Sequence, residues 1–223
     1  PQDADTYGVD RQFMLGRGVL VSPVLQPGAT TVDAYFPAGW WFILYEYSVA
    51  YTMKVGKRVT LPAPADLANA HLAGGNILLL QHAGLTTSAA RQSEFHLLVA
   101  LAENGTASGE LFLDDGESPE MGRVGGNWTL VRFSCDREES KGMVTTNVSS
   151  HVVQNSYAPS RAQVIGKVVF MGLQSAPKSF TIYVNNVELK AARTKSRTSG
   201  VFSVSGLSLA IGKEFQIKVV MSH

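Results

Sequence analysis

The feature that most constrains the fold is a series of strand-length segments in which apolar and polar residues alternate. Residues 214–221 follow this alternation except at Val220, and Val131, Phe133 and Cys135 repeat the pattern earlier in the chain. Successive side chains of a strand point to opposite faces, so this period gives each strand one apolar face. No window keeps apolar residues at helical spacing over three turns. We therefore expect strands throughout and at most one helical turn, over residues 66–71.

Turn-forming residues separate these segments about every 8–12 positions, a spacing typical of β-sandwiches. Asn185-Asn186 follows one alternating segment, residues 180–184, and asparagine tolerates the positive φ that a two-residue hairpin requires. Residues 95–102 are apolar at most positions, which is typical of a central strand covered on both faces. The sequence predicts an all-β protein of two consecutive antiparallel β-sandwich modules, residues 1–83 and 84–223.

Composition excludes several classes of partner. The chain has 223 residues, is 45% hydrophobic and carries a net charge of +1, so it can fold around a core but lacks a strong field of one sign. No apolar run reaches the roughly 18 residues of a membrane-spanning helix. We expect neither nucleic acid nor membrane as a partner. Cys135 is the only cysteine, which excludes an intrachain disulfide, and its strand pattern predicts a buried position.

Two blocks of residues resemble a known family. Residues 12–16 read Gln-Phe-Met-Leu-Gly and are followed by Val-Leu-Val-Ser-Pro-Val at 19–24, and residues 104–117 read Asn-Gly-Thr-Ala-Ser-Gly-Glu-Leu-Phe-Leu-Asp-Asp-Gly-Glu. Between them, Gly39 precedes Trp40-Trp41. In this order the segments resemble the C-terminal β-rich part of glycoside hydrolase family 31, and they suit the plant α-glucosidase branch best.

The resemblance implies that this chain is an accessory region. In the family, an aspartate nucleophile and an aspartate acid/base lie in an upstream (β/α)₈ barrel, and this chain begins too late to contain them. The implied parent enzyme removes terminal α-linked glucose from maltose or starch-derived oligosaccharides with retention of configuration. We therefore expect no catalytic or cofactor-binding residue here, no cofactor, and only indirect contact with carbohydrate. The expected partner is the missing N-terminal and barrel portion of the same enzyme.

The proximal module, residues 1–83, is the expected docking face for that barrel. It opens with an apolar set that has few partners nearby in the sequence: Phe13, Met14, Leu15, Val19 and Val21. The distal module, residues 84–223, is the second sandwich that the resemblance implies.

The most obvious carboxylate cluster is Asp114, Asp115 and Glu117. A glycosidase needs two carboxylates that face each other across the scissile bond, whereas neighbours on one strand point to opposite faces. Asp-Gly is also a common turn, so we interpret this cluster as a turn.

The histidines offer no metal-binding motif. None of the five has an H-x-x-x-H or C-x-x-C companion, so we expect no metal site; they are His71, His82, His96, His151 and His223.

Aromatic residues crowd one segment and leave an alternative function open. Six of them lie between positions 40 and 51: Trp40, Trp41, Phe42, Tyr45, Tyr47 and Tyr51. We interpret most as core or as a seam to a neighbouring domain. Exposed rings can also serve as flat platforms for sugars, and the exposed ring of the Trp40-Trp41 pair is the best candidate. The alternative is therefore a stand-alone carbohydrate-binding or adhesion module.

Three N-x-[ST] sequons begin at Asn104, Asn127 and Asn147. Asn104 precedes a glycine and is expected in an exposed turn. Together with the resemblance, the sequons predict a glycoprotein on the secretory route, in the extracellular space, the cell wall or the vacuole.

Overall fold

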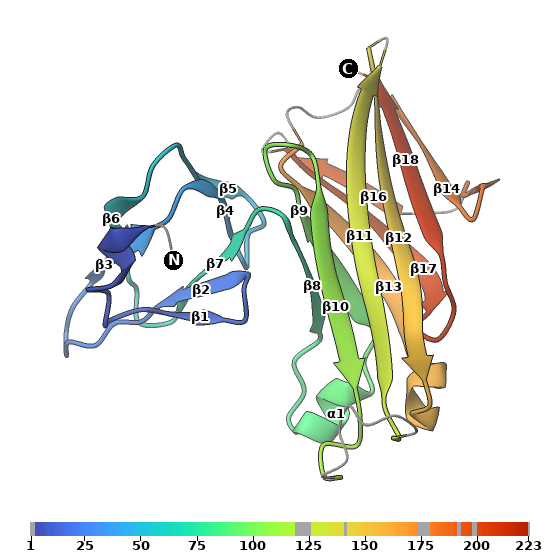
Figure 1. Cartoon of the computed structure of the whole chain (residues 1–223), viewed down its shortest axis with the longest axis horizontal. Coiled ribbons are helices and arrows are strands. Elements are labelled where there is room, and N and C mark those ends of the chain that lie inside the picture. The colour runs from blue at the N-terminus through green and yellow to red at the C-terminus, as the bar shows by residue number, and fades with distance from the viewer. Residues whose placement is uncertain are drawn as a thin grey trace.

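The computed structural model describes residues 3–118, 126–140, 142–173, 179–190, 193–197 and 200–222. These residues form two β-rich lobes that lie side by side (Figure 1). The helices are short: η1 (Ala4–Thr6), α1 (Thr87–Arg91) and η2 (Ala158–Ala162). Within the described ranges, no helix has the length and apolarity needed to cross a membrane. The predicted all-β class is confirmed. His223 lies outside the described residues.

The first lobe contains a five-stranded sheet that faces a two-stranded sheet. The larger sheet has the order β1-β2-β7-β4-β5, with β1 (Phe13–Leu15), β2 (Val19–Ser22), β7 (Asn69–Ala73), β4 (Gly39–Ile43) and β5 (Val49–Met53). The smaller sheet pairs β3 (Thr31–Phe36) with β6 (Lys57–Pro62). All pairs in both sheets are antiparallel.

The core of the first lobe lies between these two sheets. Leu20 and Trp41 project from the larger sheet onto Phe36 and Leu61 of the smaller one. The helical turn expected over residues 66–71 is wrong, because His71 lies within β7. The His71 side chain packs against Phe36 on one face of β7, and those of Ala70 and Leu72 pack into a second apolar cluster on the other face. Packing on both faces favours a strand.

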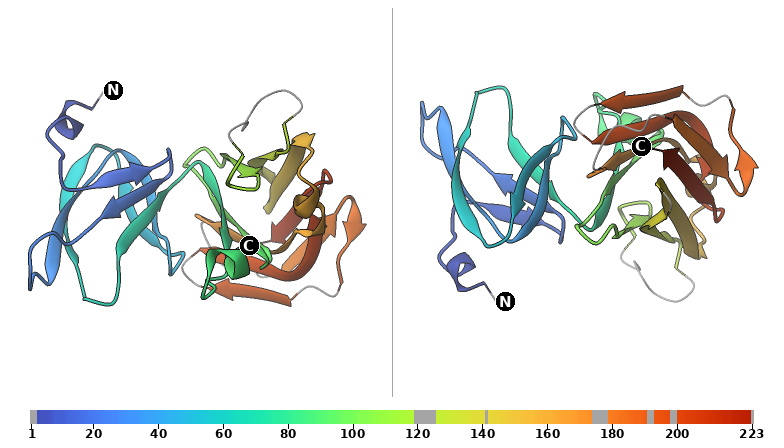
Figure 2. Two further views of the ribbon diagram at one scale, coloured as in Figure 1. Left: turned by 90° about the horizontal axis from the view of Figure 1, so that it is seen from below. Right: turned by 90° about the horizontal axis from the view of Figure 1, so that it is seen from above.

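The second lobe is built on one eleven-stranded sheet that curls until its two halves face each other (Figure 2). Its order is β15-β14-β18-β12-β11-β10-β8-β9-β13-β17-β16. The strands are β8 (Asn76–Gln81), β9 (Phe95–Ala100), β10 (Ala107–Leu113), β11 (Thr129–Ser140), β12 (Met143–Asn155), β13 (Val164–Met171), β14 (Ser179–Val184), β15 (Val187–Glu188), β16 (Arg193–Arg197), β17 (Val201–Ala210) and β18 (Gln216–Ser222). Most pairs are antiparallel, and β9–β13 and β8–β10 are parallel.

The alternating patterns occupy the places that the sequence predicted. Val131, Phe133 and Cys135 lie on the buried face of β11, and the apolar residues of β18 meet them in the same core. Asn185 and Asn186 have positive φ values of 50° and 65° and join β14 to β15, which confirms the predicted hairpin.

The two lobes share a third core. β9 runs between β8 and β13, and its side chains alternate between the core of the second lobe and this shared core. On the second lobe, Leu98, Val169 and Met171 face Phe42 and Leu72 of the first. The five-stranded sheet is therefore covered on both faces, by β3–β6 on one side and by the second lobe on the other.

Candidate functional site

The strand β1 forms an exposed apolar edge. Phe13, Met14 and Leu15 are 50%, 42% and 59% exposed, and β1 is the terminal strand of its sheet. Phe13 lies opposite Val21 and Leu15 opposite Val19, so both side chains point to the same face as the residues that meet the second lobe. We call Phe13, Met14 and Leu15 the apolar edge. An edge strand that carries three exposed apolar residues offers both backbone groups and apolar surface to a partner.

The residues before β1 hold this edge in place. The Gln12 side chain donates to the carbonyl of Tyr35 (2.9 Å) and accepts from its N–H (2.6 Å). The side-chain amide of Gln12 thus bonds both backbone groups of Tyr35, as a neighbouring strand would. The Tyr35 hydroxyl donates to Asp3 (2.8 Å). This hydrogen bond, with burial and the nearby carboxylates, raises the pKa of Tyr35 to about 12. The beginning of the chain is thus fixed against the sheet on which β1 lies.

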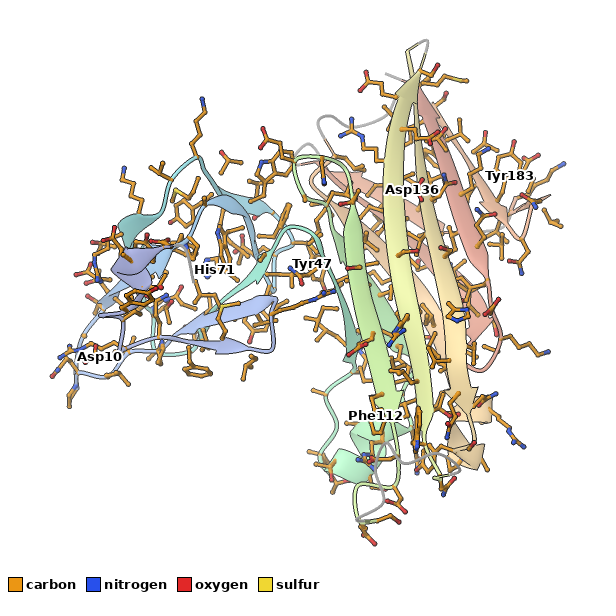
Figure 3. The ribbon with its side chains drawn as sticks, viewed as in Figure 1. Asp10, Tyr47, His71, Phe112, Asp136 and Tyr183 are labelled. Carbon is orange, nitrogen blue, oxygen red and sulfur yellow. The ribbon has the colours of Figure 1, made fainter. Side chains whose placement is uncertain are left out.

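A hollow of about 420 Å³ lies beside β1, between residues 8–12 and the loop after β2. Val24 and Leu25 add exposed apolar surface to its wall, and Asp10 and Arg11 add charge. Figure 3 shows Asp10 at the end of the first lobe that lies away from the second. Apolar and charged groups therefore lie together on this end of the molecule, as in a surface that binds another protein domain.

The tryptophan pair lies mainly in the interior. Trp41 is 4% exposed, contacts the Phe36 ring edge-on, and donates its indole N–H to the carbonyl of Pro37 (2.9 Å). It therefore presents no ring face to a sugar. Trp40 is half-buried against the shared core and borders a hollow of about 470 Å³ that Asn104 also lines. Of the predicted sugar platform, only part of Trp40 stays accessible.

The carboxylate cluster is a hydrogen-bonded turn. Asp115 accepts from the Ser118 hydroxyl (2.6 Å) and from the N–H groups of Glu117 and Ser118. These bonds, the Ser118 hydroxyl first, lower the pKa of Asp115 to about 2. Asp114 accepts from the N–H of Gly116, whose φ is 74°. A carboxylate that is fixed as an acceptor in a turn is poorly suited to proton transfer.

The three sequons lie in different environments. Asn104 is exposed, and its Oδ1 accepts from the N–H and the hydroxyl of Thr106. Asn127 is exposed, whereas the Thr129 of its sequon is fully buried and bonds to Ser160 (2.9 Å). Asn147 lies within β12 and donates its amide to Asp136 (3.0 Å).

The four histidines within the described residues lie in three places: one is buried, one pairs with a glutamate at the surface, and two lie together in a cluster. His71 lies in the first lobe (Figure 3), contacts the Phe36 ring edge-on and has its pKa lowered to about 4 by burial. His151 bonds to Glu214 at 2.8 Å. His82 and His96 lie close to Glu94, a grouping that the search for short motifs missed because 13 residues separate the two histidines in the chain. The signal that could have found it is the pairing of β8 with β9.

Comparison with known proteins gives two consistent results. Residues 1–78 match the model of the "Glycosyl hydrolase family 31 C-terminal domain". The whole chain is 58% identical to a probable alpha-glucosidase of Oryza sativa subsp. japonica and 58% identical to an alpha-glucosidase of Hordeum vulgare. The chain spans only 26% of the length of each of these relatives.

A solved structure shares the fold. In a crystal structure of an ER glucosidase II heterodimeric complex, one chain superposes on this chain with a TM-score of 0.75 and 18% identity. The superposition covers all of this chain and 24% of that one. Both lobes therefore match a region of a longer chain.

Proposed function

The chain belongs to glycosyl hydrolase family 31, in whose α-glucosidases it corresponds to the C-terminal part, and from this premise we propose that it is a non-catalytic accessory region that stabilises the rest of such an enzyme. The observation that carries the proposal is the apolar edge, Phe13, Met14 and Leu15, on a strand that has one neighbouring strand among the residues that the structure describes. The proposed partner is the remaining, catalytic portion of the same polypeptide.

The chemistry belongs to that portion. We propose that the parent enzyme releases terminal α-linked glucose from maltose or starch-derived oligosaccharides with retention. A retaining glycosidase needs two carboxyl groups about 5–5.5 Å apart on either side of the scissile bond. Asp114 and Asp115 are adjacent and are held by hydrogen bonds of their own turn, which supports an accessory role for this chain.

We propose further that the region comprises two modules, residues 1–83 and 84–223. β8 precedes this boundary in the sequence, but it pairs with β9 and β10 in the sheet of the second lobe. The shared core supports a rigid junction, because cutting the chain there would expose Phe42 and Leu98 to water.

The secretory route, ending in the cell wall, the extracellular space or the vacuole, is the proposed location. The three sequons support it, and Asn104 is the best acceptor because it is exposed and lies in the turn between β9 and β10.

The experiment is to place a charge on the apolar edge in the complete enzyme. Phe13→Asp and Leu15→Asp should lower the melting temperature of the full-length α-glucosidase by several degrees, because each buries a carboxylate against the partner. Leu85→Asp is the matched control, since Leu85 is fully exposed. In the isolated 223-residue chain, all three variants should melt close to the wild type. Edge variants of the full-length enzyme that melt like Leu85→Asp would refute the docking role.

A further inference from the structure

Two histidines and a glutamate meet at the end of the β8–β9 pair where residues 82–94 connect the two strands. These strands pair antiparallel, with Leu80 opposite His96 and Gln81 opposite Phe95, so His82 and Glu94 follow as the next opposed residues. Opposed residues share a face, and so do Glu94 and His96, which are two positions apart. In the structure, one ligand atom from each of the three residues lies within 4.8 Å of the other two. Their convergence follows from the strand register.

The cluster is held by groups around it. His96 Nε2 lies 3.6 Å from Glu94 Oε1, and the His82 and His96 rings are 4.4 Å apart between centroids at an angle of 82°. The backbone N–H of His82 donates to the Ser93 hydroxyl (3.0 Å). Gln81 donates its amide to the carbonyl of Ser93 (2.9 Å). Two hydrogen bonds to Ser93 therefore join the end of β8 to the segment that leads into β9.

A glycine leaves room for the carboxylate. Gly166 lies at the register shift of β13, between Ile165 and Lys167, where this strand pairs with β9. A Cβ at position 166 would collide with both carboxylate oxygens of Glu94. The register shift and the absent side chain together leave space beside β13 for the Glu94 carboxylate, which lies 3.6 Å from His96 Nε2.

We propose that His82, Glu94 and His96 bind a divalent transition-metal ion, Zn²⁺ in the first place. Two imidazole nitrogens and one carboxylate oxygen form a donor set that zinc uses in proteins, and water can occupy the fourth position. The nitrogen donors disfavour Ca²⁺ and Mg²⁺, which prefer oxygen ligands. This site is independent of the accessory role proposed above.

The charged groups beside the two imidazoles are Glu94 and, on the neighbouring strand β13, Lys167. Glu94 contributes one negative charge. The Lys167 ammonium, the cation on the neighbouring strand, lies 5.9 Å from the centre of the Tyr47 ring.

The location gives the ion a structural effect. Leu80 and Leu98, on the same face of the same two strands, belong to the shared core of the lobes, and Tyr47 lies between the lobes (Figure 3). An ion that ties the end of β8 to β9 would hold the hairpin that carries this core. Zn²⁺ binding should therefore raise the melting temperature of the chain.

The test is a calorimetric titration of the untagged 223-residue chain with Zn²⁺ alone at about pH 7. We expect one site, with binding weakened more than about tenfold in His82→Ala, His96→Ala and Glu94→Gln. Co²⁺ should give the intense visible absorption of a four-coordinate site in the wild type only. His82 and Glu94 are exposed, so their variants keep the fold, which circular dichroism checks.

His151→Ala is the matched control, because His151 also pairs with a glutamate, Glu214, but lies outside the cluster. It should bind Zn²⁺ like the wild type. Absence of Zn²⁺ binding by the wild type, binding unchanged by the three cluster variants, or binding lost in His151→Ala would each overturn the proposal.

Discussion

Replacement of Phe42 by alanine tests whether the two lobes depend on one shared core. Phe42 is fully buried and belongs to the shared core. Its ring lies against Gly172 of the second lobe, where a Cβ atom would be only 3.0 Å from the Phe42 Cζ atom. Removal of a buried phenylalanine side chain loses its transfer free energy and leaves a cavity, together about 3–5 kcal/mol. In a chain of this size, that corresponds to a fall in melting temperature of roughly 6–20 °C.

Phe13→Ala is the matched control on the same lobe. Phe13 is 50% exposed, so its removal should cost about 1 kcal/mol or less in the isolated chain. Urea unfolding followed by tryptophan fluorescence measures both variants, because Trp40 borders the shared core and Trp41 the core of the first lobe. Equal losses in the two variants, or a loss below about 1 kcal/mol for Phe42→Ala, would refute the shared core.

Three further predictions concern single groups. Burial lowers the pKa of His71 to about 4. Below about pH 6.5 the unfolded chain therefore binds a proton at this histidine that the folded chain does not bind. The free energy of unfolding should keep its full value above this pH and fall by about 3 kcal/mol as the pH drops toward 4. Urea unfolding of the wild type and of His71→Phe at several pH values checks this, and a wild-type profile as flat as that of the variant would contradict it. Burial first, and then Asp136, raises the pKa of Cys135 to about 12, so the folded chain should resist a thiol reagent that the unfolded chain consumes; rapid labelling of the folded chain would be the opposite result. Asn104 should carry a glycan when the chain is made in a plant or yeast secretory host, and peptide mapping that finds this asparagine unmodified would count against the location proposed above.

Much of the fold was predictable because strand faces follow a period of two. The buried residues of β11 and β18, the two-sided burial of β9 and the Asn185-Asn186 hairpin all depend on local pattern and turn chemistry, and all are confirmed. The parallel pairing of β9 with β13 and the curling of one sheet into two layers depend on contacts between distant segments. Alternation within one strand carries no information about which strand will lie beside it.

The functional surfaces were predictable only in part. Of the apolar start of the chain, Phe13, Met14 and Leu15 lie exposed on an edge strand. Val19 and Val21, which the sequence grouped with them, instead pack into the core shared by the two lobes. The sequence could not show which of Trp40 and Trp41 is fully buried, since both are tryptophans on the same strand. Their burial differs because their side chains point to opposite faces of β4, and the sequence does not show what covers each face. The approach of His82 to His96 required the register of β8 against β9, which no spacing along the chain reveals.

The most direct measurement of the central claim is the hydrolysis of maltose and of an aryl α-glucoside by the isolated chain. The chain should show no turnover above buffer, whereas the proposed full-length enzyme should hydrolyse both substrates. Turnover that persists through repurification and is lost in Asp114→Asn or Asp115→Asn would contradict the accessory role, because it would place the chemistry in the turn that we assign to structure.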